Sequence, residues 1–339
     1  MKRRHGMAEP GPRNLITDVP GLLVGQAQDE AGITGTTVVL CEAPAVAAVD
    51  VRGGAPGSRE TELLDSAALV QRVDAIVLSG GSAFGLDAAG GVMKGLAAMG
   101  RGFAVRDVRV PIVPAAILFD LAFTGRLPWS GEPPYRRLGR AALAQAGPDF
   151  RLGNAGAGLG AKSGRLKGGV GSASLRLGDQ VMVGAIVAVN SWGSVVRPDC
   201  GRFWAAEQAL AGEIEPQPTL PAGPLDPEDF SACAAASAGA NTTIAVVATN
   251  APLDKTGCRR LAIMAQAGLA QAIRPAHTPF DGDTVFALAT GVGGEVDPAT
   301  LARLGSTAAS CLARAIMRAV LEAAPFGSLP SWRQLWAIG

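Results

Sequence analysis

The stretch Asn241-Thr242-Thr243-Ile244-Ala245-Val246-Val247 places two threonines at the start of an apolar run that predicts a buried β-strand. A segment of small residues, 234–240, precedes it. A hydroxyl at this point can attack the preceding carbonyl, form an ester that hydrolyses, and so cut the chain. The alternative interpretation is that the two threonines simply begin a strand, as β-branched residues often do.

Cleavage before Thr242 would release an α-amine on the nucleophile itself. An α-amine has a reference pKa of about 7.7–8.0, so a useful fraction is neutral at physiological pH. Such an amine can serve as general base for its own hydroxyl, and no histidine is needed. This matters because the chain contains only two histidines, His5 and His277.

Two further stretches place polar groups at the ends of apolar strand patterns. Asp281-Gly282-Asp283 precedes the pattern at 284–288; its carboxylates can share a proton or orient a nucleophile, although the stretch also suits an ordinary turn. Asn190 ends the pattern at 180–190, where its amide can cap the strand or act as an oxyanion donor. Few other oxygen ligands lie near the two acids, so we expect no metal.

Two glycine-rich turns suggest other chemistry. Ser79-Gly80-Gly81-Ser82 follows a strand pattern and resembles a nucleophile elbow, except that Phe84 stands where that motif needs glycine. The loop 156–163 is one residue from a phosphate-binding P-loop and also fits a loose dinucleotide fingerprint, but residues 148–154 before it form a poor strand. A tight strand-to-helix turn and a closely packed glycine loop are the alternatives.

The composition limits the class of protein. Of 339 residues, 48% are hydrophobic and 17% charged, and the mean hydropathy is +0.25, which excludes intrinsic disorder as the main state. Thirty basic and 29 acidic side chains, without a basic run, give no clustered positive surface for nucleic acid. The N-terminus lacks the apolar block of a secretion signal, and the run 181–196 is too short and interrupted to span a bilayer. Five scattered cysteines suit reduced thiols, so we expect a cytoplasmic protein without a membrane partner.

The pattern of elements predicts an α/β protein. We expect strands at 36–40 and 46–51 joined by a turn at 41–44, a strand at 74–78 leading into a helix at 83–99, and a helix in 112–121 that begins after Pro114. Residues 213–228 contain five prolines and indicate an exposed linker. After it we expect strands at 243–249 and 284–289 and helices at about 255–273 and 298–323.

Taken together, these segments resemble the self-processing DmpA-type peptidases, a group of D-aminopeptidase/esterases, β-aminopeptidases and nylon-oligomer (6-aminohexanoate-oligomer) hydrolases. The matching segments follow one order along most of the chain: 16–21, 49–57, 78–86, 110–115, 167–173, 189–190, 241–244 and 277–284. The resemblance implies a four-layer α/β/β/α sandwich of the N-terminal-nucleophile hydrolase type. It also implies a single self-processing domain, 1–339, that is cut between Asn241 and Thr242 into subunits 1–241 and 242–339.

The same resemblance implies roles for single residues. Thr242 is expected to be the nucleophile and, through its new amine, the base. Asn190 is expected to be a donor on the oxyanion side. Asp281 and Asp283 are expected to orient the nucleophile and to control its proton transfers. The resemblance implies a Ser/Glu arrangement at these two places in β-aminopeptidases, so the acid pair favours the nylon-oligomer branch.

One basic residue of the nylon-oligomer hydrolases has a less direct counterpart. Those enzymes carry a catalytic lysine shortly after the glycine loop, and Arg165 stands at the best equivalent position, with Lys167 close by. Arginine does not release its proton, so Arg165 would act only electrostatically or on the substrate.

We therefore expect an amide hydrolase that cleaves small peptides, amino-acid amides or linear oligoamides. It would need no cofactor and would assemble as a homo-oligomer, with a tetramer as the expected state. Two alternatives stay open. One is a serine hydrolase that uses Ser82 with His277, and the other is a non-catalytic binding protein of the same fold that holds a phosphate ligand in the loop 156–163.

Overall fold

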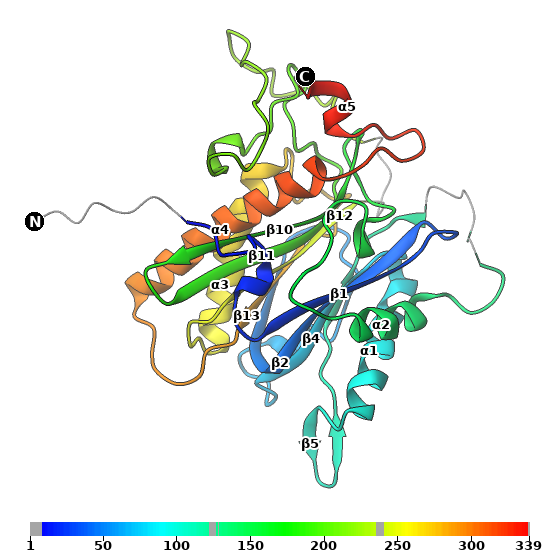
Figure 1. Cartoon of the computed structure of the whole chain (residues 1–339), viewed down its shortest axis with the longest axis vertical. Coiled ribbons are helices and arrows are strands. Elements are labelled where there is room, and N and C mark those ends of the chain that lie inside the picture. The colour runs from blue at the N-terminus through cyan, green and yellow to red at the C-terminus, as the bar shows by residue number, and fades with distance from the viewer. Residues whose placement is uncertain (1–8, 122–126, 128, 235–240, 338–339) are drawn as a thin grey trace, which may run out of the picture.

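The computed structural model describes residues 9–121, 127, 129–234 and 241–337. Within these residues, nine strands form one continuous sheet (Figure 1): β1 (Leu22–Asp29), β2 (Thr34–Val51), β3 (Ser58–Arg59), β4 (Arg72–Ser79), β7 (Ala115–Ile117), β10 (Gly169–Leu177), β11 (Val181–Asn190), β12 (Thr242–Thr249) and β13 (Thr284–Ala289). The strand order is β10-β11-β12-β13-β2-β4-β7-β3, and β1 pairs with β2. Two small hairpins are separate from this sheet: β5 (Phe103–Val105) with β6 (Val108–Val110), and β8 (Lys162–Ser163) with β9 (Leu166–Lys167).

The described α-helices are α1 (Asp87–Ala98), α2 (Tyr135–Ala144), α3 (Lys255–Ala272), α4 (Pro298–Leu321) and α5 (Trp332–Trp336). Short 3-10 turns lie at η1 (Ile16–Asp18), η2 (Glu62–Leu64), η3 (Ser82–Leu86), η5 (Gly156–Gly158) and η6 (Ala206–Gln208). Helix α4 begins as its sequence predicts, because the Asp297 side chain accepts hydrogen bonds from the amides of Ala299 and Thr300.

Strand β2 connects the two halves of the sheet. Its first part pairs with β1 up to Cys41 and with β4 up to Leu40, and its last part, from Val46, pairs with β13. The register against β4 shifts between Leu40 and Ala45, which marks a β-bulge. Our prediction of two strands with a turn at 41–44 was therefore wrong. Pro44 lies in the bulge, where a residue without a backbone N–H is tolerated.

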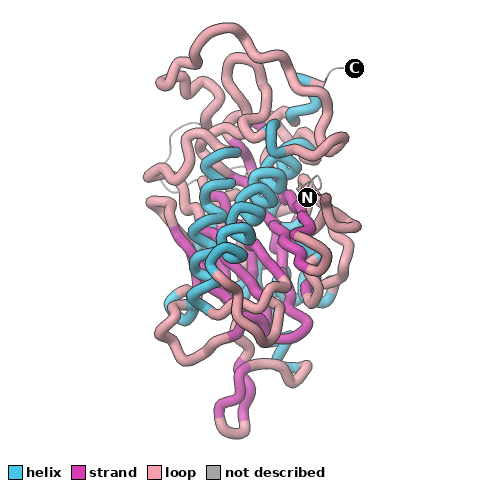
Figure 2. Tube along the Cα trace, turned by 90° about the vertical axis from the view of Figure 1, so that its left-hand side faces the viewer, coloured by secondary structure: helices cyan, strands magenta, loops and turns pink. Residues whose placement is uncertain are grey.

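Three apolar cores divide the molecule into four layers. The first lies between α3 and α4 and one face of the strands β10–β13, where Figure 2 shows the two long helices side by side over the strands. The second lies between the two halves of the sheet and joins Val39 and Leu78 to Ile244 and Phe286. The third lies between α1 and α2 and the other half of the sheet. This order, helix, sheet, sheet, helix, confirms the predicted α/β/β/α sandwich.

The predicted helix after Pro114 is also wrong. Residues Ala115–Ile117 form β7, which pairs in parallel with β4 and in an antiparallel manner with β3. A short apolar run does not by itself distinguish a buried strand from a helix, and here the two neighbouring strands decide the outcome.

The proline-rich residues 213–228 form neither helix nor strand, as predicted. The side chain of their first residue, Glu213, is nevertheless only 5% exposed and pairs with Arg314 of α4 at 2.6 Å. By length and composition alone, helix α4 could cross a membrane. However, 78% of its most apolar 18-residue stretch is buried inside the fold, as in the core helix of a folded domain. The five cysteines are all unpaired.

Candidate active site

Strand pairing brings the predicted site residues together. Asn190, the last residue of β11, lies directly opposite Thr242, the first residue of β12. On the other side of β12, Asn241 forms a parallel bridge with Asp281, which lies just before β13. All four residues are at most 3% exposed. The site therefore forms where the ends of three adjacent strands meet.

The peptide bond between Asn241 and Thr242 is surrounded by groups of the same site. The Thr242 hydroxyl contacts the Asn241 carbonyl oxygen. The Gly282 amide donates to that oxygen at 3.1 Å. A Cβ on Gly282 would lie 2.8 Å from Thr242 Oγ1, so glycine allows the acid loop (residues 277–283) to approach this closely.

Asp283 holds the start of β12 through its side chain. Its Oδ1 accepts a hydrogen bond from the Thr243 amide at 2.9 Å. Its Oδ2 accepts from the His277 amide at 3.0 Å and lies 2.9 Å from His277 Nδ1. His277 has a positive φ of 58°, and in this conformation both its amide and its ring meet the same carboxylate oxygen. His277 is thus a partner of the acid pair.

Asp281 is held by a different set of donors. Its Oδ1 accepts from the Trp192 amide at 3.1 Å, and its Oδ2 accepts from the Thr278 amide at 3.2 Å and from the Thr278 hydroxyl. Burial, and next the charge of Asp283, raise the pKa of Asp281. The two carboxyls therefore favour states in which Asp281 carries a proton more readily than an exposed aspartate does.

A neighbouring loop, residues 52–55, supports the acid loop through its backbone. The Gly53 amide donates to the Asp283 carbonyl at 3.3 Å, and the Ala55 amide donates to the Asp281 carbonyl at 2.8 Å. A Cβ on Gly53 would overlap the backbone of the acid loop. The resemblance included these residues, but only the fold assigns them the task of holding the acid pair.

The Asn190 side chain is fully buried and fixed at both ends of its amide. Its Oδ1 accepts from the Lys162 amide at 3.0 Å, and its Nδ2 donates to the Phe119 carbonyl at 3.0 Å. The orientation of the amide is therefore set before any substrate binds. A fixed amide beside a nucleophile suits the stabilisation of a developing oxyanion.

Of the two basic residues considered, Lys167 is buried and Arg165 is exposed. Burial lowers the pKa of Lys167 to about 7, and the charge of Asp120 opposes this. The Arg165 amide donates to Ala232, in the segment that leads towards Thr242. The ammonium of Lys167 donates to three backbone carbonyls at 2.7–2.8 Å, those of Gly158, Ala161 and Gly168.

Sequence reasoning missed Asp120, which follows β7 and is 2% exposed. Its carboxylate accepts from Thr34 Oγ1 and from the Gly81 amide, both at 2.7 Å. Burial raises the pKa of Asp120 to about 7 in spite of these hydrogen bonds. The available signal was a single carboxylate within the apolar run 112–121.

The geometry does not support the two alternative interpretations. The described residues include no hydrogen bond between Ser82 and His277, whose Nδ1 bonds to Asp283. In the loop 156–163, several amides donate to protein side chains and two carbonyls accept from Lys167. This loop therefore packs around a lysine of the protein itself, which agrees with the alternative interpretation of residues 156–163 as a closely packed glycine loop.

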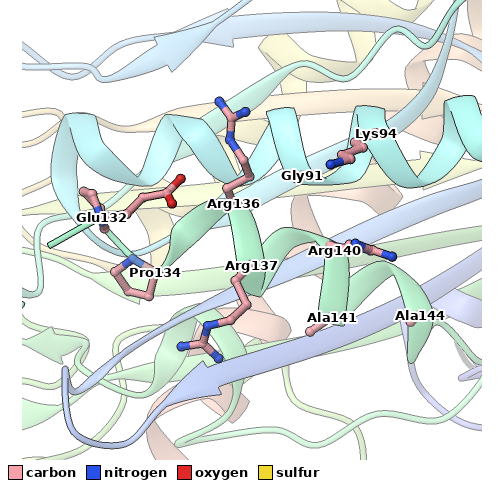
Figure 3. A pocket seen from close by; sticks show the side chains of 10 residues that line it. Gly91, Lys94, Glu132, Pro134, Arg136, Arg137, Arg140, Ala141 and Ala144 are labelled. Carbon is pink, nitrogen blue, oxygen red and sulfur yellow. The ribbon is translucent and has the colours of Figure 1, made fainter.

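Several cavities lie along the described residues, among them two that carry aromatic or charged side chains. One of about 590 Å³ lies next to the acid loop and has His277, Phe230 and Trp204 among its lining residues. The other, of about 550 Å³, lies between α1 and α2 and carries the basic side chains Lys94, Arg136, Arg137 and Arg140 (Figure 3). The described residues contain no group of three or more His, Cys, Asp or Glu side chains able to hold a metal ion. The first cavity reaches the proposed site through His277, which also lines another cavity, of about 530 Å³, beside α3 and α4.

Comparison with known proteins decides the family. Residues 14–329 match peptidase family S58. This chain is a member of peptidase family S58. Its sequence is 46% identical over 347 residues to a Mycobacterium tuberculosis protein named uncharacterized aminopeptidase, and the match covers 95% of this chain and 98% of the relative. It is 33% identical over 332 residues to a 6-aminohexanoate-oligomer endohydrolase of Kocuria sp., covering 93% and 87%.

Solved structures agree with this assignment. The S58 chain matches a Burkholderia sp. β-aminopeptidase with a TM-score of 0.69 and 25% identity, over 96% of this chain and 91% of that one. An L-aminopeptidase D-Ala-esterase/amidase of Ochrobactrum anthropi, described as a variant of the Ntn hydrolase fold, matches with a TM-score of 0.68 and 19% identity, over 95% and 90%, which supports the fold alone. The predicted family and the predicted activity class, hydrolysis of amide or peptide bonds, are confirmed.

Proposed function

We propose that this S58 enzyme cuts itself between Asn241 and Thr242 and then hydrolyses amides with Thr242 as an N-terminal nucleophile. The observation that carries the proposal is the contact between the Thr242 hydroxyl and the carbonyl of the bond before it, with the Gly282 amide donating to the same oxygen. A hydrogen bond to that oxygen stabilises the negative charge that develops when the hydroxyl attacks.

The self-cleavage step transfers one acyl group. Thr242 Oγ attacks the Asn241 carbonyl carbon, the C–N bond breaks, and the hydroxyl proton goes to the nitrogen that becomes the α-amine. Water then hydrolyses the ester, which leaves a carboxylate on Asn241 and regenerates the hydroxyl.

In the cleaved enzyme, the α-amine of Thr242 takes the hydroxyl proton as the hydroxyl attacks a substrate amide. Asn190, opposite Thr242 in the sheet, is the proposed donor to the oxyanion. Asp283 holds the Thr243 amide and thereby the position of the nucleophile. The protonated amine gives its proton to the leaving nitrogen, and water hydrolyses the acyl-enzyme.

The proposed substrates are small peptides, amino-acid amides or linear oligoamides. The names of the relatives, aminopeptidase and 6-aminohexanoate-oligomer endohydrolase, support this range. The cavity beside His277 supports it too, because its walls combine apolar rings such as Phe230 with the charged side chains of Asp229 and Arg274. Such walls suit a short chain with both apolar and polar groups.

The test combines intact mass with activity. Purified wild-type protein is expected to convert over hours from 34.3 kDa to two fragments of roughly 24 and 10 kDa, the smaller beginning at Thr242. Thr242→Ala should stay whole and inactive on a panel of amino-acid amides, whereas Thr242→Ser should still cut. Activity in uncut Thr242→Ala would contradict the proposal and favour the Ser82 alternative.

We also propose that the enzyme is a homo-oligomer, with a tetramer as the expected state. The β5–β6 hairpin supports this, because Phe103, Val105, Val108 and Val110 are 38–62% exposed, and adjacent exposed apolar side chains often mark interaction sites. Light scattering after size exclusion measures the mass, and a monomer mass would contradict the proposal.

A further inference from the structure

The mechanism above assigns no role to Asp120. This buried acid contacts three segments that lie far apart in the sequence. Its carboxylate binds the hydroxyl of Thr34 on β2 and the amide of Gly81 in the turn after β4. A Cβ on Gly80 would overlap that carboxylate, and a Cβ on Gly160 would come 2.7 Å from the Asp120 Cβ. Glycines in both turns thus make room for one buried acid.

Lys167 contacts the same glycine loop (residues 156–163), and its side chain is fully buried. An ammonium has three hydrogens, and the three carbonyls around this one use all of them. That arrangement favours the charged form. A buried charge is costly unless an opposite charge lies near it. Gly160 packs against the Asp120 side chain, and its neighbours in the loop, Gly158 and Ala161, carry two of the carbonyls that bind Lys167. Asp120 is accordingly the acid whose charge acts on Lys167.

The backbone beside Asp120 leads directly to the proposed site. The carbonyl of Phe119, the residue before it, accepts the hydrogen bond from Asn190 Nδ2. Asn190 in turn lies opposite Thr242. A shift of Asp120 would therefore move the carbonyl that orients the Asn190 amide.

We propose that Asp120 is a positioning residue of this site: as the buried counter-charge of Lys167, it fixes the turn whose Phe119 carbonyl orients Asn190. The inference rests on the proposed function, in which Asn190 assists the Thr242 nucleophile. In this proposal the turn at 79–82 holds the acid and the loop 156–163 holds the lysine, so both segments help to position Asn190.

Among the residues that the structure describes, the titratable groups that act on Asp120 or are acted on by it are Lys167 of β9 and Tyr135 of α2. Burial, and next the charge of Asp120, raise the pKa of Tyr135, so Tyr135 stays neutral. In the absence of the Asp120 charge, Lys167 loses its proton at lower pH. A role of Asp120 that does not depend on its charge would not move this titration.

The experiment compares Asp120→Asn with Asp74→Asn in the cleaved enzyme. Asp74 is a matched control, because it is also 2% exposed and accepts from a backbone amide, that of Ile112, away from the site. We expect Asp120→Asn to lower kcat by about tenfold to a hundredfold with little change in KM, as for a misplaced catalytic group. We also expect the alkaline limb of its kcat profile to move to lower pH, and Asp74→Asn to show neither change.

Wild-type kcat in Asp120→Asn, or a lower kcat with an unmoved pH profile, would overturn the proposal. If Asp120→Asn does not fold, the double variant Asp120→Asn/Lys167→Met, which leaves no unpaired charge, is measured instead. It should fold and turn over slowly; failure to fold or wild-type turnover would overturn the pairing. Thr242→Ala separates the two proposals, because it retains turnover only if the proposed function itself is wrong.

Discussion

The contact between Gly282 and the nucleophile yields the sharpest test of the site geometry. In Gly282→Ala, the new methyl group would lie 2.8 Å from Thr242 Oγ1 and 2.7 Å from the Ala55 carbonyl. Gly282 is not among the glycines with positive φ, so alanine suits the backbone and the effect is steric.

The size of the effect follows from the distances. Ordinary van der Waals contact for such a methyl begins at 3.4 Å, so the hydroxyl has to retreat by about 0.6 Å. A misplacement of about 1 Å costs roughly a hundredfold in rate, so we expect self-cleavage to slow by about tenfold to a hundredfold. Overpacking of a dense site also costs about 1–3 kcal/mol of stability.

The assay follows the 34.3 kDa band on denaturing gels over hours after purification, together with thermal unfolding. Gly147→Ala is the matched control, because a Cβ there has no atom within 4 Å. It should cleave at the wild-type rate. If Gly282→Ala also cleaves at that rate while folded, the hydroxyl does not lie against Gly282 during attack, and our account of the cleavage geometry is wrong.

Three further predictions concern other parts of the molecule. Asn190→Ala should lower kcat of the cleaved enzyme by about 10²–10³-fold, the usual cost of one oxyanion donor, as measured by steady-state amide hydrolysis; a smaller loss would remove Asn190 from that role. Ser82→Ala should leave fragment formation and turnover near wild type, and loss of turnover with intact cleavage would revive the serine-hydrolase alternative. Burial acts to raise the pKa of Glu213, but the hydrogen bonds and charge of Arg314 outweigh it and hold that pKa below its usual value of 4.5. A lowered folded-state pKa contributes stability above the unfolded-state pKa, and this is lost as pH falls through the folded value. Urea unfolding should therefore show Glu213→Gln less stable by about 3–5 kcal/mol at neutral pH, with the gap closing in acid; a constant gap would contradict the pairing.

Much of the site could be predicted from the sequence because its residues lie at the ends of recognisable strands. Thr242, Asn190 and the two acids each border a strongly apolar run, and the register of β11, β12 and β13 brings those borders together. Asp120 could not be predicted in this way. Its partners come from β2 and from the turn after β4, far away in the chain, and only packing brings them into contact.

The choice between the two basic residues shows the same limit. Spacing along the chain favoured Arg165 over Lys167 as the counterpart of the lysine in the nylon-oligomer hydrolases. Spacing does not show whether a side chain is buried or which groups surround it, and in these respects the two residues differ. The fold places Lys167 among carbonyls of a loop six to nine residues earlier and leaves Arg165 in solvent. The turn predicted at Pro44 and the helix predicted after Pro114 failed for a related reason. Strand β2 continues beyond its bulge to pair again with β4 and with β13, and β3 and β4 pair with residues 115–117.

By itself, the sequence determined the alternation of strands and helices, the large apolar core and the position of the hydroxyl at the start of β12, since these depend on local periodicity and on residue chemistry. The tertiary structure alone decided which carbonyls surround Lys167, which amides hold the acid pair, and that a glycine faces the nucleophile. These are contacts between segments distant in sequence. Their strength depends on burial and on the charges nearby, neither of which exists until the four layers pack.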